Sequence, residues 1–375
     1  MRIGVAAETD PAETRVAASP ETVKKFVDLG AEVAVEHGAG LKAGMIDADF
    51  RSAGARLASA EEALGADLVL KVRRPSAGDL ARVKNGVLIV AIMDPYGHQE
   101  AIEAMAKAGV AAFAMELLPR ITRAQVMDVL SSQANLAGYR AVVDASAEYG
   151  RALPMMMTPA GTVPAARMFI MGVGVAGLQA IATGRRLGAV VTATDVRPAT
   201  KEQVESLGAK FVAVEDDEFK QAETAGGYAK EMSDGYKARQ AALIASHIAK
   251  QDIVVTTALI PGRPAPRLIT ADMVNSMRAG SVIVDLAVER GGNCELSKPG
   301  ELATSENGVK IVGYSSVTRL AATAASLYAR NLYAFAETLI DKKNKALAVD
   351  WDDELVKATC LTRDGAIVHP DFQPK

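Results

Sequence analysis

The apolar residues of this chain recur in short runs that alternate with segments whose apolar positions follow the period of a helix. In the first third, such runs predict strands at Arg2–Ala7, Glu32–Glu36, Leu68–Val72, Gly86–Met93 and Ala111–Glu116. A helix is expected over Pro20–Leu29, because Ser19 is a suitable N-cap, Pro20 fits the first helical position and Gly30 ends the pattern. This alternation is typical of βαβ units in a mostly parallel sheet.

The pattern then changes to a long segment without proline, Arg123–Tyr149, which predicts one extended helix. A second series of strands is expected after it, at Met168–Met171, Val190–Thr194, Phe211–Val214, Ile253–Thr257, Ser281–Leu286 and Lys310–Tyr314. Six strands with intervening helices complete a doubly wound fold. After Tyr314 the chain predicts helix to about Ile340, and Asp364-Gly365 predicts a hairpin within Lys357–His369.

These elements predict the α/β class, with two Rossmann-like domains built on parallel sheets, the second inserted in the first and joined to it by long helices. The expected N-terminal domain is discontinuous and comprises residues 1–130 plus 320–375. The expected nucleotide-binding domain, 131–319, begins with the linking helix. A length of 375 residues suits two domains of ordinary size.

The strand expected at Met168–Met171 leads through a glycine-rich turn into a helical pattern. This turn, Gly172-Val173-Gly174-Val175-Ala176-Gly177, has the spacing G-x-G-x-x-G. Gly172 allows a tight turn, Gly174 lets the backbone approach a pyrophosphate, and Gly177 lets helix and strand pack closely. The N–H groups and partial positive charge of the helix N-terminus suit phosphates. Such glycines can serve packing alone, but the strand–turn–helix context favours a dinucleotide site.

The next apolar run ends at Asp195, eighteen residues after Gly177. A carboxylate at this place can accept hydrogen bonds from a ribose 2′-hydroxyl, and it would repel a 2′-phosphate. The sequence therefore predicts NAD(H) rather than NADP(H) as the ligand of this domain.

One polar segment, Glu215–Gln240, interrupts the second domain and contains Gly226-Gly227-Tyr228. A loop of this length inside a compact domain is usually functional or disordered. It predicts either a lid that closes over bound cofactor or a solvated insertion without a role, and the residues alone do not separate the two.

A second candidate site begins the long helix. Gln125, Asp128 and Ser131 are three residues apart and would lie within a third of a helix circumference, with Arg120 just before them. Asp accepts hydrogen bonds from the N–H₂ of a carboxamide, whereas Arg and Ser can donate to its C=O. A capping and salt-bridge cluster at a helix start is the other interpretation, and the spacing leaves both open.

Other candidates in the first third carry less information. Arg15 could bind an anion or pair with Glu13 or Glu8, and Lys71-Val-Arg73-Arg74 ends a strand where ligand groups often lie, although a solvated strand end explains it equally well. His98 could act as an acid or base, but a surface role fits it better. The four histidines of the chain show no spacing that suggests a triad or a metal site.

Composition narrows the classes of partner. A net charge of −3 argues against nucleic acid as the main partner. Two cysteines form no metal-ligand pattern and indicate no disulfide framework, which favours a reducing compartment. The first residues, MRIGVAAETD, lack the design of a signal peptide. Because the uncharged stretch Met168–Gly184 is better explained as strand, turn and helix, no direct membrane insertion is expected.

Several long segments together resemble the alanine dehydrogenase and nicotinamide nucleotide transhydrogenase family, from Glu13-Thr-Arg-Val-Ala to the segment 362–370. Within this family the chain is most similar to the NAD(H)-binding component of the proton-translocating transhydrogenases. The segments that carry the resemblance are Pro119-Arg-Ile-Thr-Arg-Ala-Gln, Ser131-Ser-Gln-Ala-Asn-Leu-Ala-Gly-Tyr-Arg140, Gly172-Val-Gly-Val-Ala-Gly-Leu-Gln-Ala180, Ala222-Glu-Thr-Ala-Gly-Gly-Tyr-Ala-Lys-Glu-Met232 and Thr256-Thr-Ala-Leu-Ile-Pro-Gly262.

The resemblance implies a homodimer with NAD(H) in the cleft between two Rossmann-like domains. It implies that the loop with Gly227 and Tyr228 closes over the nucleotide. It also implies that Arg120, Asp128 and Ser131 bind the nicotinamide carboxamide and that Gln125 reaches toward a partner's NADP(H). The residues implied to lie in or near the adenosine pocket are Asp195, Val196, Arg197, Gln240, Ala258 and Leu259.

The same resemblance implies partners. Because the chain has one dinucleotide fingerprint and no membrane span, an NADP(H)-binding beta subunit and a membrane-spanning alpha-type subunit would be separate polypeptides. The chain would then be cytoplasmic, peripheral on the inner membrane through those subunits.

Chemistry separates the two activities of the family. Oxidative deamination of alanine needs a proton acceptor, and the family's dehydrogenases use a lysine where this chain has Arg73, which cannot act as a base at neutral pH. Hydride transfer between two nicotinamides needs no acid or base, only two rings held close with water excluded. The sequence therefore favours a transhydrogenase subunit. An amino-acid dehydrogenase, or a non-catalytic NAD-binding module, is the alternative.

Overall fold

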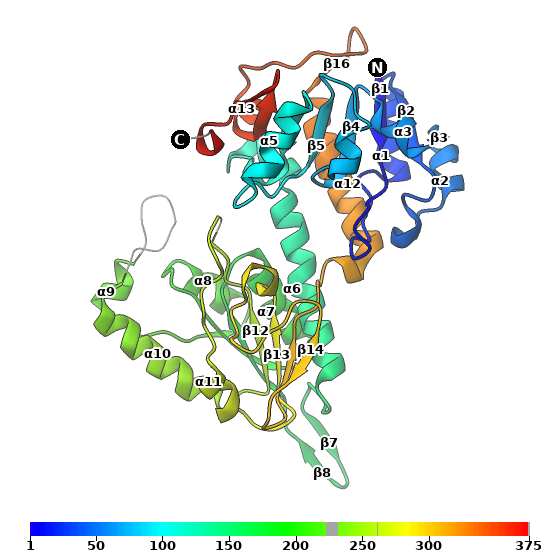
Figure 1. Ribbon diagram of the computed structural model, residues 1–375. Helices are drawn as coiled ribbons and strands as arrows, with labels where there is room; N and C mark the ends of the chain where they lie inside the picture. The colour runs from blue at the N-terminus through cyan, green and yellow to red at the C-terminus, as the bar shows by residue number, and fades with distance from the viewer. Residues whose placement is uncertain (223–231, 261, 374–375) are drawn as a thin grey trace. The chain divides into compact units, whose positions relative to one another are not determined.

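The computed structural model describes residues 1–222, 232–260 and 262–373. Two compact units make up the chain. Unit 1 comprises residues 1–133 with 318–375, and unit 2 comprises residues 134–317. In Figure 1, unit 1 carries the blue, cyan, orange and red segments of the chain, and unit 2 carries the green and yellow segments. The teal helix α6 (Val129–Glu148) begins in unit 1 and continues into unit 2.

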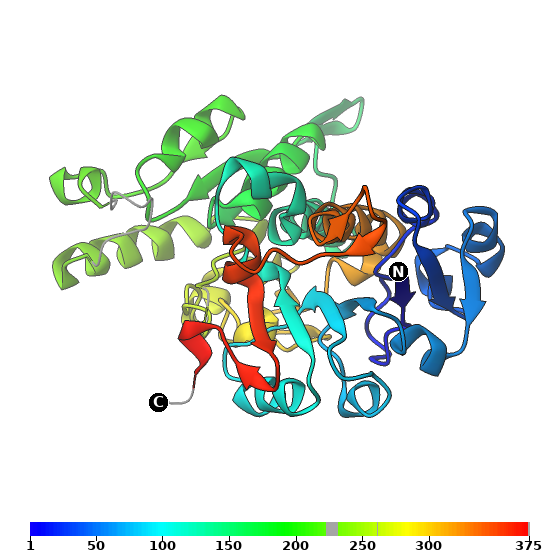
Figure 2. The same ribbon diagram turned by 90° about the horizontal axis from the view of Figure 1, so that it is seen from above.

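Unit 1 is built on an eight-stranded sheet with the order β19-β18-β6-β5-β4-β1-β2-β3. Strands β1 to β6, the first six in the sequence, run parallel. Their order across the sheet, β3-β2-β1-β4-β5-β6, is that of a doubly wound fold. Their bounds are β1 Arg2–Val5, β2 Glu32–Glu36, β3 Arg56–Ala58, β4 Leu68–Arg73, β5 Leu88–Ile92, β6 Ala111–Ala114, β18 Cys360–Arg363 and β19 Ala366–Ile367. Strand β18 runs antiparallel to β6, and β19 runs antiparallel to β18. The red C-terminal strands therefore extend the sheet beside β6 (Figure 2).

The helices of unit 1 are α1 Pro20–Asp28, α2 Asp47–Ser52, α3 Ala60–Leu64, α4 Ala77–Leu80, α5 Gln99–Lys107, α12 Ala321–Glu337 and α13 Glu354–Thr359. The start of α1 confirms the sequence prediction, since Ser19 caps it and Pro20 opens it. Helix α12 returns the chain to unit 1 and packs on the sheet. Its Tyr328 is fully buried, and the Tyr328 hydroxyl donates to the Lys71 carbonyl at 3.0 Å and accepts from the Ile92 N–H at 3.2 Å.

Unit 2 is built on a seven-stranded sheet with the order β11-β10-β9-β12-β13-β15-β14. The bounds of its strands are β9 Arg167–Met171, β10 Val190–Thr194, β11 Lys210–Phe211, β12 Ile253–Thr256, β13 Val282–Asp285, β14 Leu302–Thr304 and β15 Lys310–Val312. The six strands other than β14 are parallel and again follow the order 3-2-1-4-5-6. The expected α/β class with two parallel-sheet, Rossmann-like units is confirmed.

The helices of unit 2, besides its portion of α6, are α7 Val175–Arg186, α8 Thr200–Ser206, α9 Asp217–Lys220, α10 Asp234–Ile248 and α11 Ala271–Ser276. Two short antiparallel hairpins complete the chain, β7 (Met156–Thr158) with β8 (Gly161–Val163) in unit 2, and β16 (Ile340–Asp341) with β17 (Ala346–Leu347) in unit 1. The C-terminal hairpin of β18 and β19 confirms the turn expected at Asp364-Gly365.

Two sequence predictions of structure were wrong. The single helix expected over Arg123–Tyr149 is a 3-10 segment, η3 (Thr122–Met127), followed by α6. Asp128 breaks the pattern, because its backbone is extended and its carboxylate accepts a hydrogen bond from the Ser131 N–H, which starts a new helix. The loop expected over Glu215–Gln240 contains α9 and the start of α10, whose caps are Asp216 and Ser233.

Both cysteines are buried and free. Burial raises the pKa of the Cys294 thiol and of the Cys360 thiol to about 11. In the described segments of the chain, no helix combines the length and the apolar character needed to cross a bilayer. Within the same residues, no three His, Cys, Asp or Glu side chains gather as metal ligands would.

Candidate functional site

The glycine-rich turn after β9 has the geometry that its sequence predicts. Gly172 has a φ of 101°, a left-handed conformation that favours glycine, and its N–H donates to the Thr194 carbonyl at 2.9 Å. A Cβ added at Gly177 would lie 1.9 Å from the Gly172 carbonyl oxygen, so the close packing of α7 on the turn requires a glycine there. These two glycines therefore fix the turn and the helix that follows it.

The middle glycine has a different environment. A Cβ added at Gly174 would meet no atom within 4 Å, and Gly174 is exposed where it caps α7. Val175 and Ala176, the first residues of α7, direct their N–H groups out of the helix start, as helix geometry requires. Open space beside a bare helix N-terminus is the environment that a phosphate group needs. The residues present thus fit a dinucleotide pyrophosphate.

Asp195 follows β10 and its side chain is only 7% exposed. One carboxylate oxygen accepts from the Val173 N–H at 2.7 Å, and the other accepts from the Arg197 N–H at 2.9 Å. The Arg197 guanidinium donates to both oxygens, at 2.9 and 3.1 Å, so that four donors fill the capacity of the carboxylate. A ribose hydroxyl can bind Asp195 only after the Arg197 side chain yields one of these positions. Val196, between them, is 58% exposed.

Three more predicted residues lie around the carboxyl ends of the same sheet. Gln240, on α10, accepts from the Val214 N–H at 2.8 Å and donates to the Thr194 hydroxyl at 3.3 Å, which places its amide beside the end of β10. Ala258 and Leu259 follow β12, and Leu259 is 53% exposed. The structure thus brings these residues and the glycine turn to the edge where doubly wound sheets bind ligands.

Sequence reasoning missed a residue that holds this edge together. Asn293 is fully buried, and its amide oxygen accepts from the Ala258 N–H at 3.0 Å. Its amide nitrogen donates to the carbonyls of Ala258 at 2.9 Å and Pro266 at 2.8 Å. Asn293 therefore fixes the backbone just before Leu259. The preceding Gly291 and Gly292, both with positive φ, were the local signal for a specialised turn.

The polar residues before α6 lie in unit 1, and they do not share one α-helix as expected. Gln125 is exposed on η3, whereas Asp128 and Ser131 are partly buried at the start of α6. The Asp128 carboxylate accepts from the Ser131 N–H at 2.9 Å and from the Ser131 hydroxyl at 2.6 Å. Asp128 thus caps the helix, which is one of the two interpretations that the sequence left open. Arg120 is exposed just before η3.

The remaining predicted site residues, Gly227 and Tyr228, lie outside the described residues.

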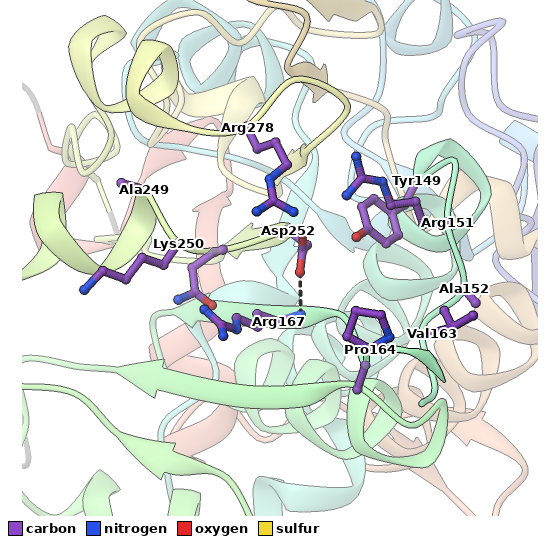
Figure 3. A pocket seen from close by; sticks show the side chains of 12 residues that line it. Tyr149, Arg151, Ala152, Val163, Pro164, Arg167, Ala249, Lys250, Asp252 and Arg278 are labelled. Carbon is purple, nitrogen blue, oxygen red and sulfur yellow. Dashed lines mark hydrogen bonds between the residues drawn. The ribbon is translucent and has the colours of Figure 1, made fainter. Parts of the chain in front are cut away.

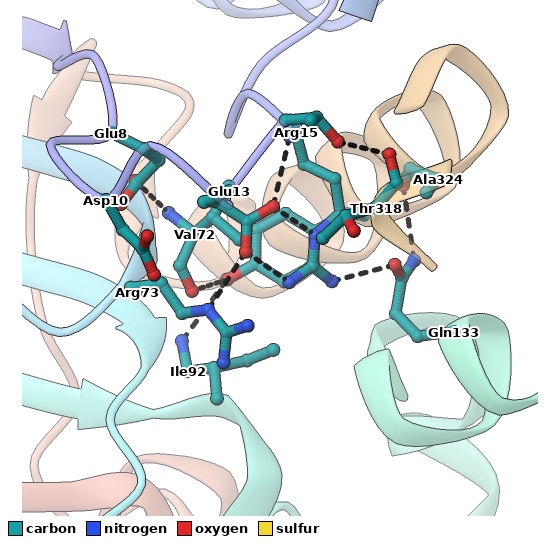
Figure 4. Close-up of polar contacts among 12 residues, drawn as sticks. Glu8, Asp10, Glu13, Arg15, Val72, Arg73, Ile92, Gln133, Thr318 and Ala324 are labelled. Atoms are coloured by element: carbon teal, nitrogen blue, oxygen red, sulfur yellow. Dashed lines mark hydrogen bonds and ion pairs between the residues drawn. The ribbon is translucent and has the colours of Figure 1, made fainter. Parts of the chain in front are cut away.

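Buried charges fill the corresponding edge of the unit 1 sheet (Figure 4). The Arg15 guanidinium donates to both Glu13 oxygens, at 2.8 and 2.7 Å, and to the Gln133 amide oxygen at 2.9 Å. Arg73 also donates to Glu13, at 2.9 Å. Burial alone would raise the pKa of Glu13, but its hydrogen bonds with Arg15 and the positive charges of Arg15 and Arg73 outweigh it, and the pKa is lowered. Of the expectations for Arg15, pairing with Glu13 is the one observed.

Neighbouring charges complete this cluster. Lys71 is 1% exposed, which contradicts the idea of a solvated strand end, and its ammonium lies 3.6 Å from Glu8 and 3.4 Å from Asp79. His98 is partly exposed, with Nδ1 3.7 Å from the Asp94 carboxylate. The Arg73 guanidinium donates to Glu13, and a guanidinium is not a suitable base for amino-acid oxidation.

Two family models together match nearly the whole chain. Residues 4–137 match the family model described as alanine dehydrogenase/PNT, N-terminal domain, and residues 141–370 match alanine dehydrogenase/PNT, C-terminal domain. The chain belongs to the alanine dehydrogenase/PNT family. This membership confirms the family expected from the sequence.

Known proteins resemble the chain over most or nearly all of its length. An NAD(P) transhydrogenase subunit alpha chain of Rhodospirillum rubrum is 55% identical over 378 residues, which cover 99% of this chain and 98% of the relative. The crystal structure of transhydrogenase from Sinorhizobium meliloti is 60% identical, has a TM-score of 0.90 and covers 98% of this chain and 100% of that one. Alanine dehydrogenase 1 of Staphylococcus aureus is more distant, at 30% identity over 80% of this chain and 76% of the relative.

Proposed function

We propose that this chain is the NAD(H)-binding alpha subunit of a proton-translocating NAD(P) transhydrogenase, and that it passes hydride from NADH to NADP⁺ held on a partner subunit. The observation that carries the proposal is the nearly full-length similarity to a transhydrogenase alpha-subunit chain at 55% identity and to a transhydrogenase structure at 60% identity, against 30% for an alanine dehydrogenase. The site chemistry supports the same choice, because the dehydrogenase base is replaced by Arg73 in an ion pair.

Unit 2 would hold the pyrophosphate and adenosine of NAD(H). The open space at Gly174 and the start of α7 suit the pyrophosphate, and Asp195 suits the adenosine ribose once Arg197 gives up one hydrogen bond. Val173 keeps the Asp195 carboxylate oriented through its N–H. The negative charge of Asp195 disfavours a 2′-phosphate, which supports NAD(H) over NADP(H).

Unit 1 would hold the nicotinamide carboxamide. Because the Ser131 hydroxyl already donates its proton to Asp128, its oxygen presents lone pairs, so Ser131 would accept from the carboxamide rather than donate to it. Arg120 would donate to the carboxamide oxygen, and Asp128 would accept from its N–H₂. Gln125, exposed on η3, would face the NADP(H) of the partner.

NAD(H), when bound, supplies the hydride. No proton has to move to or from a side chain, so the chain's task is to orient the ring and to exclude water. The assembly would be a homodimer joined to an NADP(H)-binding beta subunit and a membrane-spanning alpha-type subunit, and the chain would be cytoplasmic and peripheral on the inner membrane.

The test uses the purified chain in two assays. NADH-dependent reduction of NADP⁺ is measured with an added NADP(H)-binding subunit, and alanine-dependent reduction of NAD⁺ is measured with the chain alone. We expect activity in the first assay and none in the second. Activity with alanine alone would indicate an amino-acid dehydrogenase, and NADH binding without either activity would indicate a binding module.

A further inference from the structure

Unit 2 has a cavity at the end of its sheet that the glycine turn does not use. The cavity has a volume of about 420 Å³, within the range of small-molecule sites. Arg167 is the first residue of β9, and Asp252 directly precedes β12, so both lie at the amino ends of strands whose carboxyl ends lead to Gly172 and Ala258. With five residues in β9 at about 3.3 Å each, the cavity and the glycine turn are roughly 16 Å apart.

Cationic side chains dominate the lining of this cavity. Arg151, Arg167, Lys250 and Arg278 contribute four positive charges, and Asp252 contributes one negative charge. All four cationic residues are exposed. Arg167, Lys250 and Arg278 form no ion pair within 4.0 Å with any carboxylate of the described residues. The net charge of the lining is therefore +3, in a chain whose total net charge is −3.

The one carboxylate of the cavity already has partners. An Asp252 oxygen accepts from the Arg167 N–H at 2.8 Å. Burial raises the pKa of the Tyr149 hydroxyl, and the negative charge of Asp252 raises it further, so Tyr149 is neutral at pH 7. Figure 3 shows the guanidinium of Arg278 and the ring of Tyr149 directed toward Asp252, with Arg151 beside the ring. Asp252 thus lies among the potential donors of the cavity and is fixed by the Arg167 backbone.

Two apolar residues, Val163 and Pro164, at the end of the hairpin of β7 and β8, also line the cavity. A guanidinium binds a phosphate or a carboxylate through paired hydrogen bonds, so one carboxylate or one hydrated chloride would engage only part of this set of arginines, whereas an anion with several phosphate groups can engage three of them at once. We propose that this cavity binds a small organic anion with two or more phosphate groups, whose phosphates contact Arg167, Arg278 and Arg151 and whose organic moiety lies against Val163 and Pro164. Because the site and the glycine turn occupy opposite ends of the strands, this anion does not compete with the dinucleotide.

Isothermal titration calorimetry tests the site, with inorganic pyrophosphate and ADP as probes and with the full chain kept in saturating NADH. The variant R167Q/R278Q removes two guanidinium groups, and R51Q/R82Q removes two exposed arginines outside the cavity as the matched control. We expect both probes to bind the wild-type chain and the control alike, and the Kd for the double variant to rise at least about tenfold. ADP should bind more tightly than pyrophosphate, because only ADP has a moiety that reaches the apolar residues of the cavity.

Folding of the double variant is checked by its NADH affinity, which should stay within about twofold of wild type because the glycine turn lies in the same unit. If R167Q/R278Q fails this check, R278Q alone is compared with R82Q, and the titrations are repeated without NADH. Equal probe affinity in the variant and the wild type would overturn the proposal. So would the absence of binding to the wild-type chain, or binding of pyrophosphate that NADH abolishes.

Discussion

Gly174 and Gly177, at the start of α7, differ in the space that a side chain would have. Substituting each by alanine distinguishes a packing role for Gly177 from a ligand-binding role for Gly174. A Cβ at Gly177 would lie 1.9 Å from the Gly172 oxygen and 2.9 Å from its carbon, both backbone atoms that cannot rotate away. To reach an ordinary contact, α7 has to move by well over an ångström. Overpacking of this kind costs about 1–3 kcal/mol, and contact with backbone places G177A at the upper end of that range.

Gly174 is expected to respond in the other way. Its φ of −84° and ψ of −166° are allowed for alanine, and no atom lies within 4 Å of the added Cβ. Replacing glycine by alanine at an N-cap should cost less than about 1 kcal/mol. The methyl group would, however, occupy the space into which a pyrophosphate has to fit. An unfavourable overlap of about 1–3 kcal/mol corresponds to a Kd for NADH raised by roughly 5–150-fold.

The assay combines urea unfolding with NADH titration for wild type, G174A and G177A. We expect G174A to unfold like wild type but to bind NADH weakly, and G177A to unfold at a clearly lower urea concentration. NADH affinity of G174A within twofold of wild type would refute the placement of the pyrophosphate. Wild-type stability of G177A would refute the argument that close packing of helix and turn requires a glycine.

Three further substitutions test the other regions of the site. D195N should raise the Kd for NADH by about 10–100-fold, because one acceptor oxygen and the charge that holds Arg197 are lost. The Kd for NADPH should fall relative to the Kd for NADH. An unchanged ratio of the two constants would exclude Asp195 from ribose selection. D128N should lower NADH-to-NADP⁺ transfer at least about tenfold at a stability loss near 1 kcal/mol, since asparagine also caps helices; unaltered turnover would leave Asp128 as a cap only. E13Q should destabilise the folded chain by about 3–5 kcal/mol at pH 7, because Arg15 stays buried without its counter-ion. Because the pKa of Glu13 is lowered in the folded chain, its contribution to the free energy of unfolding is present above the ordinary value of 4.5 and is lost as the pH falls. The free energies of urea unfolding at pH 7 and pH 4 should therefore differ less for E13Q than for wild type. An equal difference would contradict the lowered pKa.

The sequence predicted the buried strands well because burial leaves an unambiguous apolar run. The expected bounds of β2 and β10 agree with the structure to the residue. Strands β3 and β14 were missed, since each has three residues at or near a sheet edge and little apolar signal. The break at Asp128 was missed because a capping carboxylate competes with helix continuation, and apolar periodicity does not record that competition.

The features of the candidate site also differ in how well the sequence predicts them. The conformation of the glycine turn was predictable because it depends on neighbours in sequence. Asn293 was not, because its partner Ala258 is 35 residues away. The saturation of Asp195 by Arg197 also depends on side-chain geometry that spacing does not encode.

The burial of both cysteines has a practical consequence. A thiol whose pKa is near 11 is almost wholly protonated at neutral pH, so it reacts slowly with maleimides and similar reagents. A cysteine introduced at an exposed position such as Lys24 would therefore take up a fluorescent dye or spin label selectively. Conformational probes can be attached to the native chain without first replacing Cys294 and Cys360, whose side chains fill space in the interior.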